Sequence, residues 1–133
     1  MEAQDIFDRV SQHLLSQGVR STDEEELDNM YRGSDGTRCA AGVLIPDDEF
    51  DPAMEGMPWP LAGSAEDLTD AEESIRQAHN RLISIAERVG HHSFVKSLQL
   101  IHDVDEPSRW QASLTILATK EGLSSEAIDG AAP

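Results

Sequence analysis

Apolar residues recur at helical spacing in four stretches of the chain, and each stretch predicts an amphipathic helix with one face in a core. The four stretches are residues 3–16, 69–89, 91–103 and 108–122. Gly18, Gly90 and Gly122 follow or close three of them, at positions where a left-handed residue ends a helix. The pattern therefore predicts a mainly α (α+β) fold, a small helical domain of about four main helices.

The same spacing predicts which side chains face the core. These positions are Ile6, Phe7, Val10, Leu14, Ala71, Ile75, Ala78, Leu82, Ile85, Ala86, Val89, Phe94, Leu98, Ile101, Trp110, Leu114, Leu117 and Ala118. In the second helix, Thr69 and Glu72 match a capping box. Acids precede bases along that helix, which suits its dipole.

The stretch YRGSDGTRCAAGVLIPDDEFDPAMEG, residues 31–56, separates the first helix from the others. Its GSDG favours a tight turn, because Gly and Asp tolerate a positive φ. We expect the three residues on either side of GSDG to pair, giving a short β-hairpin near residues 29–39. The apolar run AAGVLI that follows is predicted to be either a short buried helix or a buried strand, and periodicity does not choose between them.

Length and tail composition indicate the domain organisation. A chain of 133 residues is the size of one domain, and a hydrophobic share of 38% permits a core of modest size. We assign residues 1–123 to a single compact acidic domain. Residues 124–133 are mostly small and polar, which predicts a flexible C-terminal tail.

Charge restricts the classes of partner. The chain has 26 acidic and 10 basic residues, a net charge of −16, with the excess heavier in its first half. Such a surface repels nucleic acid and anionic membranes, so we expect a basic protein partner and no direct contact with DNA, RNA or membrane. The single Cys excludes an internal disulfide and suits a reducing cytoplasm. The acidic N-terminus is unlike a signal peptide.

Two acidic runs and one tryptophan are the candidate partner-binding residues. They are Asp23, Glu24, Glu25, Glu26, Asp28, Asp47, Asp48, Glu49, Asp51 and Trp59. An acidic run is either a solvated loop or a docking surface for a basic partner. Pro58 and Pro60 hold Trp59 in an extended loop, where it either covers the core or stands exposed as a binding anchor.

Catalytic and metal chemistry have weaker sequence support. Cys39 has no His in its motif, which favours a buried structural thiol over a nucleophile. The spacing of the second acidic run does not match a calcium loop. The histidines do not have zinc-ligand spacing, and His102 with Asp103 suggests a local hydrogen-bonded pair. We therefore predict no metal, no cofactor and no catalytic residue.

Three segments together carry a resemblance to a known group of proteins. They are IFDRVSQHLLSQG, then YRGSDGTRCAAGVLIPDDEFDPAMEG, and LQLIHDVDEPSRWQASL. Between residues 5 and 118 the chain resembles small proteins of tailed-phage and prophage genomes with a YRGxxGxxCAxGxLIPDxx[YF]DPxMEG motif. Phe50 stands where this motif often has Tyr. The resemblance implies a non-structural phage protein in the cytoplasm of the bacterial host, and it transfers no catalytic residue.

Three functional hypotheses follow. The first is a phage- or prophage-encoded acidic protein that binds and inhibits a host nucleic-acid-binding or defence protein, such as a CRISPR effector, by nucleic-acid mimicry. The second is a small enzyme that uses Cys39 with a distant His. The third is an acidic protein of a salt-tolerant host whose charge serves no partner. The oligomeric state is not predicted.

Overall fold

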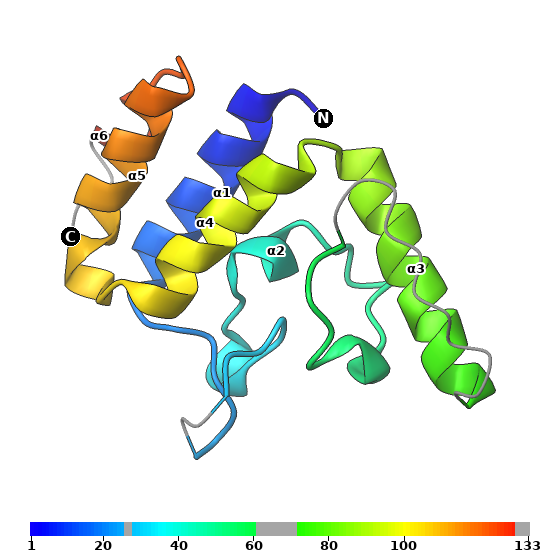
Figure 1. Cartoon of the computed structure of the whole chain (residues 1–133). Coiled ribbons are helices and arrows are strands. Elements are labelled where there is room, and N and C mark those ends of the chain that lie inside the picture. The colour runs from blue at the N-terminus through cyan, green and yellow to red at the C-terminus, as the bar shows by residue number, and fades with distance from the viewer. Residues whose placement is uncertain (26–27, 61–71, 130–133) are drawn as a thin grey trace.

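The computed structural model describes residues 1–25, 28–60 and 72–129, and within these ranges the protein is mainly α-helical without a β-strand. The α-helices are α1 (Ala3–Gln17), α2 (Ala40–Val43), α3 (Glu73–Val89), α4 (His92–Val104), α5 (Trp110–Lys120) and α6 (Glu126–Asp129). Three 3-10 turns join them: η1 (Ser34–Gly36), η2 (Pro52–Met54) and η3 (Pro107–Arg109). Helix α4 packs against α1, α2 and α5, while α3 stands at the opposite end of the molecule from α5 (Figure 1).

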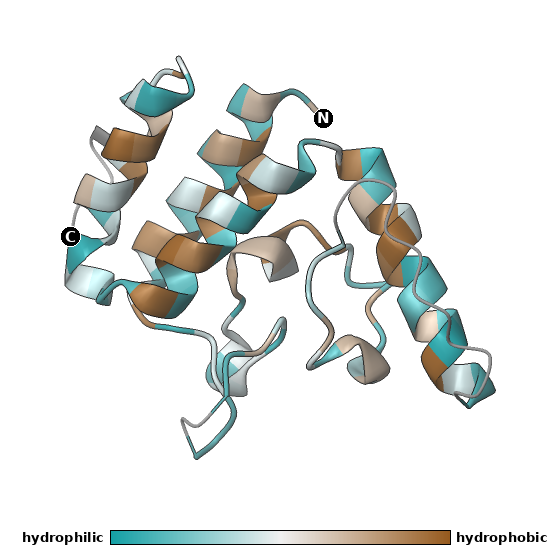
Figure 2. Cartoon of the chain, viewed as in Figure 1, coloured by the Kyte–Doolittle hydropathy of each residue, from teal (hydrophilic) through white to brown (hydrophobic). Residues whose placement is uncertain are grey.

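The long helices confirm the periodicity argument. Brown and teal residues alternate around them, as expected for helices with one buried face (Figure 2). All four apolar positions predicted for α1 are fully buried. Gly18 ends this helix with a φ of 70°, and its N–H donates to the Leu14 carbonyl at 2.8 Å.

Helix α3 departs from its prediction at its N-terminal end. It begins at Glu73, and the Thr69 cap and Ala71 lie outside the described residues. Ile75 is 39% exposed, so its predicted place in the core is wrong, whereas Leu82 and Val89 are buried. Helix α3 contacts the rest of the described protein mainly through η2 and α4. The first turns of α3 extend beyond these contacts (Figure 1).

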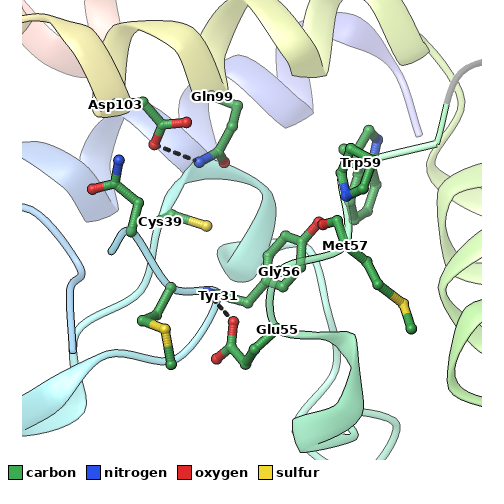
Figure 3. A pocket seen from close by; sticks show the side chains of 11 residues that line it. Tyr31, Cys39, Glu55, Gly56, Met57, Trp59, Gln99 and Asp103 are labelled. Atoms are coloured by element: carbon green, nitrogen blue, oxygen red, sulfur yellow. Dashed lines mark hydrogen bonds between the residues drawn. The ribbon is translucent and has the colours of Figure 1, made fainter. Parts of the chain in front are cut away.

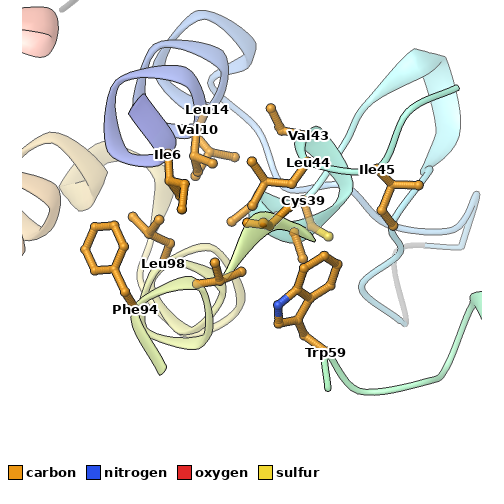
Figure 4. Close-up of a cluster of buried hydrophobic side chains, with 14 of the residues drawn as sticks. Ile6, Val10, Leu14, Cys39, Val43, Leu44, Ile45, Trp59, Phe94 and Leu98 are labelled. Carbon is orange, nitrogen blue, oxygen red and sulfur yellow. The ribbon is translucent and has the colours of Figure 1, made fainter. Parts of the chain in front are cut away.

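The core joins α1, α2 and α4 (Figure 4). Val10 and Leu14 of α1 meet Leu98 of α4 and the apolar residues of α2. The run AAGVLI therefore forms a short buried helix, one of the two alternatives that the sequence left open. Burying each large apolar side chain contributes about 1.5–3 kcal/mol, so this small helix is held by its packing and not by its length.

Arg32 makes hydrogen bonds to several parts of residues 31–56, which we call the central stretch. Its guanidinium donates to the carbonyl of Gly42 and, at 2.7 Å, to that of Ile45, and it lies 5.0 Å from the ring centroid of Phe50. The Gly42 carbonyl also accepts the Ile45 N–H at 3.3 Å, so Arg32 is a second donor to it and a donor to the Ile45 carbonyl just past α2. Gly42 itself allows the Tyr31 carbonyl to approach closely, because a Cβ there would collide with that oxygen.

The predicted β-hairpin is wrong, although its turn is present. GSDG forms η1, and one isolated bridge joins Arg32 to Arg38. The pairing does not extend into a hairpin, because side chains bond the backbone N–H and C=O groups that paired strands would use. The Glu55 carboxylate accepts the N–H groups of Tyr31 and Arg32, at 2.7 and 3.1 Å. Gln17 accepts the N–H of Arg38 at 2.8 Å and donates to its carbonyl.

The packed part of the chain extends beyond residue 123, where the sequence analysis ends the domain. Helix α6 packs on α1, and Ile128 is fully buried. Gln4 holds the backbone of Ser124 from both sides, accepting its N–H at 2.8 Å and donating to its carbonyl at 2.9 Å. A helix of four residues is not stable alone, so this contact with α1 is what orders it.

Candidate functional site

Two adjoining cavities lie beside α4 and share Asn29 and Asp103 in their linings. The first, of about 230 Å³, continues past Glu55 to Trp59 (Figure 3). The second, of about 480 Å³, continues past Thr22 to Glu106. We call these two cavities together the Asp103 groove. Its three carboxylates, Glu55, Asp103 and Glu106, come from two separate parts of the chain, and the fold brings them to one depression.

Asp103 is oriented by its neighbours on α4. Its Oδ1 accepts a hydrogen bond from Gln99 Nε2 at 2.9 Å and lies 2.7 Å from His102 Nδ1. His102 is fully buried, and its Nε2 accepts the Ser21 N–H at 2.9 Å. In the neutral ring the proton therefore sits on Nδ1 and is donated to Asp103. Both contacts go to Oδ1, which leaves Oδ2 for a ligand, and the predicted His102–Asp103 pair is confirmed.

Glu55 lies across the cavity from Asp103 (Figure 3). Its two hydrogen bonds from the backbone of Tyr31 and Arg32 fix the carboxylate without neutralising its charge. Tyr31 is buried in the lining of the same cavity, and its hydroxyl donates to the Met57 carbonyl. Burial raises the pKa of Tyr31, and the nearby charges add to that shift, so the phenol stays neutral.

The first acidic run projects beside this groove. Thr22 and Asn29 pair at the base of a loop, and both line the groove. In the loop between them, Glu24, Glu25 and Asp28 are exposed and Asp23 is half-buried, while Glu26 lies outside the described residues. We call the described carboxylates of the loop and those of the groove together the acidic face, and Arg20 also lines the groove. We call the described residues of this loop, 22–25 and 28–29, the acidic loop.

The second acidic run has internal partners. Asp47 Oδ1 lies 2.8 Å from Arg38 and 3.1 Å from Arg32, and Glu49 pairs with Arg88 of α3 at 2.6 Å. The Asp51 side chain accepts the Ala53 N–H at 2.9 Å and begins η2. Burial and the neighbouring Arg38 lower the pKa of Arg32, and Asp47 opposes that shift. Three of the four predicted binding acids in this run thus hold the central stretch together, and Asp48 is exposed.

Trp59 covers the core and does not stand out as an anchor. It is 3% exposed and packs beside Cys39 and the core residues of α4 (Figure 4). The adjoining Pro60 carbonyl lies 2.8 Å from His92 Nδ1, which ties this loop to the start of α4. The anchor alternative for Trp59 is therefore not supported, because its indole offers almost no surface to a partner.

Cys39 lacks the environment of a nucleophile. The thiol is 2% exposed, and burial raises its pKa to about 12. Its Sγ accepts the Gly42 N–H at 3.4 Å, so the side chain caps the start of α2. The imidazole of His102 is engaged by Ser21 and Asp103. Cys39 lines the first cavity, but its raised pKa and its hydrogen bond to α2 give it the properties of a structural thiol.

Metal and membrane chemistry find no support in the described ranges. No group of three or more His, Cys, Asp or Glu side chains converges there to hold a metal ion. None of the helices in these ranges is long and apolar enough to span a bilayer.

Several groove residues escaped the sequence analysis. Glu55 and Glu106 are not among the candidate residues named from the sequence. Asp103 was singled out for its pair with His102, although that pair also marks it as a carboxylate with a fixed orientation. Their convergence depends on contacts between segments far apart in sequence, which no local pattern reports.

The fold and the groove define a small acidic helical protein with a carboxylate-lined depression. Comparison of the chain with known protein families, with curated proteins and with solved structures gives no match.

Proposed function

We propose that this protein binds a basic protein through the Asp103 groove and the acidic loop, and thereby inhibits it. The observation that carries the proposal is the placement of Asp103 and Glu55 on opposite sides of one cavity, each held by hydrogen bonds. A lysine or arginine side chain that enters this cavity meets carboxylates that are already oriented. Binding then loses less conformational entropy than it would with mobile acids.

The chemistry of the face matches that of a nucleic-acid backbone. Spaced carboxylates present negative charge to Arg and Lys side chains as phosphates do, and Arg pairs with carboxylates in a bidentate manner. A basic side chain of the partner that pairs with these carboxylates cannot pair with a phosphate of its nucleic acid at the same time. The net charge of −16 also attracts a basic partner at long range and raises the association rate.

The source and place of action belong to the same proposal. The resemblance to phage and prophage proteins supports a target in the bacterial cytoplasm, either a host nucleic-acid-binding protein or a defence complex such as a CRISPR effector. Inhibition by occupancy needs no catalytic residue and no cofactor. This agrees with the buried thiol of Cys39.

The test begins with capture of the partner from a host lysate and its identification by mass spectrometry. Binding is then measured for Glu24→Lys/Glu25→Lys/Asp28→Lys. We expect at least about 100-fold weaker binding, since each contact reversal costs roughly 1 kcal/mol or more. The control is Glu87→Lys/Glu121→Lys/Glu126→Lys, which makes the same change in net charge on exposed residues elsewhere.

Two results would reject the proposal. One is equal loss of binding in the two triple variants, because then only total charge matters. The other is binding of the wild-type protein that does not weaken between about 50 and 500 mM NaCl, since contacts between exposed charges are screened over that range. A partner held here should also lose affinity for its nucleic acid in proportion to occupancy.

A further inference from the structure

His102 of α4 is a fully buried polar side chain with a different partner on each ring nitrogen. Its Nδ1 donates to the Asp103 carboxylate of the groove at 2.7 Å, and its Nε2 accepts the N–H of Ser21 at 2.9 Å. The Trp110 ring of α5 stacks against the imidazole, with the ring centroids 5.5 Å apart. The imidazole therefore joins a groove carboxylate to the backbone segment that leads into the acidic loop.

Ser21 belongs to the base of that loop. It is fully buried, its hydroxyl donates to the Met30 carbonyl at 2.8 Å, and its own carbonyl accepts the Met30 N–H at 2.9 Å. One residue further along, Thr22 pairs with Asn29. The two ends of the loop are thus bonded to each other, and the position of Ser21 sets the position of both.

The base of the loop is held by two parts of the fold. Ser34 of η1 donates its N–H to the Thr22 carbonyl at 2.9 Å, which holds the base to the central stretch. His102 holds the base to α4, the helix that carries Asp103. The Arg20 guanidinium donates to three carbonyls at the end of α4, but it is joined to its own backbone only by a flexible stem. Loss of the His102 bond would leave the base on the central stretch and free it to move relative to Asp103.

We infer that His102 is a positioning residue that fixes the acidic loop against the Asp103 groove, so that loop and groove meet the partner as one surface. The inference rests on the proposed function and names the residue that sets the spacing between the two parts of its binding face. An apolar side chain of similar size would fill the same space without either hydrogen bond. The rigid ring instead orders both parts before binding, which reduces the conformational entropy that binding costs.

The direction of the two hydrogen bonds supports this role. Ser21 donates to His102, and His102 donates to the negatively charged Asp103. Donors that point the same way along a chain of hydrogen bonds polarise one another, so each bond strengthens the next. The anchoring of the loop and the orientation of the groove carboxylate therefore depend on the same ring and the same tautomer.

Two substitutions separate the two bonds. The Asn amide lies at about the place of Nδ1, so His102→Asn keeps a donor for Asp103 and does not reach Ser21. The Gln amide lies at about the place of Nε2, so His102→Gln keeps an acceptor for the Ser21 N–H and loses the donor to Asp103. Both remove the stacking on Trp110, which makes each variant a control for lost packing in the other.

Binding to the captured partner measures the coupling between the loop and His102. With His102 present, Glu24→Lys/Glu25→Lys/Asp28→Lys should weaken binding at least about 100-fold. We expect this factor to fall to about tenfold or less in His102→Asn, and to stay within about threefold of the wild-type factor in His102→Gln. A purely structural histidine would give the same factor in both backgrounds, and that result overturns the inference.

Nuclear magnetic resonance of the free chain tests the position of the loop without a partner, so it remains decisive even where the proposed function fails. The Ser21 N–H should show a scalar coupling to His102 Nε2 across their hydrogen bond, with the ring protonated on Nδ1. Backbone amide relaxation should show added motion at Thr22 and Asn29 in His102→Asn and not in His102→Gln. A wild-type ring protonated on Nε2 overturns the inference, and so does a loop equally ordered in the two variants.

Discussion

Two acidic runs of this chain are nearly alike in sequence and quite different in the structure. The described residues of the run from Asp23 to Asp28 lie in a loop, and no ion pair involving Glu24, Glu25 or Asp28 occurs in the described part of the chain. The run from Asp47 to Asp51 is tied to three arginines and to a helix N-terminus.

The difference comes from the position of the bases. Arg32, Arg38 and Arg88 reach the second run from the central stretch and from α3, and none of these bases reaches the acidic loop. A count of acids therefore overstates the charge that a partner can meet. The proposed binding face consists of the loop and the groove, and the second run stabilises the fold on which they stand.

We expect the largest effect on stability from replacing Arg32, which pairs with Asp47 of the second run. Arg32→Ala removes the bonds to the carbonyls of Gly42 and Ile45, the Asp47 pair and the contact with Phe50. We expect the free energy of unfolding in urea to fall by about 2–4 kcal/mol, since the Ile45 carbonyl loses its donor and the Gly42 carbonyl keeps only the Ile45 N–H.

Arg76→Ala is the matched control for this loss. The side chain of Arg76 lies on an exposed face of α3 with no hydrogen bond or ion pair to another described residue, so its truncation should change stability by less than about 0.5 kcal/mol. Equal effects of the two variants would contradict the role given to Arg32.

The second prediction compares the runs directly by neutralisation. Asp47→Asn/Glu49→Gln should lower the free energy of unfolding by about 0.5–1.5 kcal/mol, a modest loss because Asp47 is 73% exposed. Glu24→Gln/Glu25→Gln should leave stability unchanged or raise it by a few tenths of a kcal/mol, because it relieves like-charge repulsion. Urea unfolding of both variants decides the matter, and the reverse order would remove the distinction between the runs.

The sequence predicts what depends on local spacing and less of what depends on long-range contacts. The inward face of α1 follows from apolar periodicity, as do the burial of Trp110 and the cap at Gly18. The hairpin prediction failed because Glu55 and Gln17 supply partners to backbone groups that a strand would use. A local sequence pattern does not indicate a hydrogen-bonding side chain that lies about twenty residues away along the chain.

The binding residues predicted from the sequence divide in the same way, into residues that are exposed and residues that have internal partners. Glu24, Glu25 and Asp28 were predicted as binding residues and are exposed, so their assignment stays a prediction that the triple variant tests. Asp47 and Glu49 carried the same sequence signal and have internal partners. The signal could not separate them, because the arginine that pairs with Glu49 follows it by 39 positions.

We expect the smallest effect on the salt dependence of stability. The two neutralised variants should deviate from the wild-type salt response in opposite directions, which separates the two runs. Raising NaCl from about 50 to 300 mM should stabilise the wild-type protein by a few tenths of a kcal/mol, since screening acts mainly on the net repulsion. Glu24→Gln/Glu25→Gln should show a smaller gain, because part of that repulsion is already gone. Asp47→Asn/Glu49→Gln should show a larger gain, because the attractive pairs that salt weakens are absent. Parallel salt responses in all three proteins would mean that neither run has a local electrostatic role.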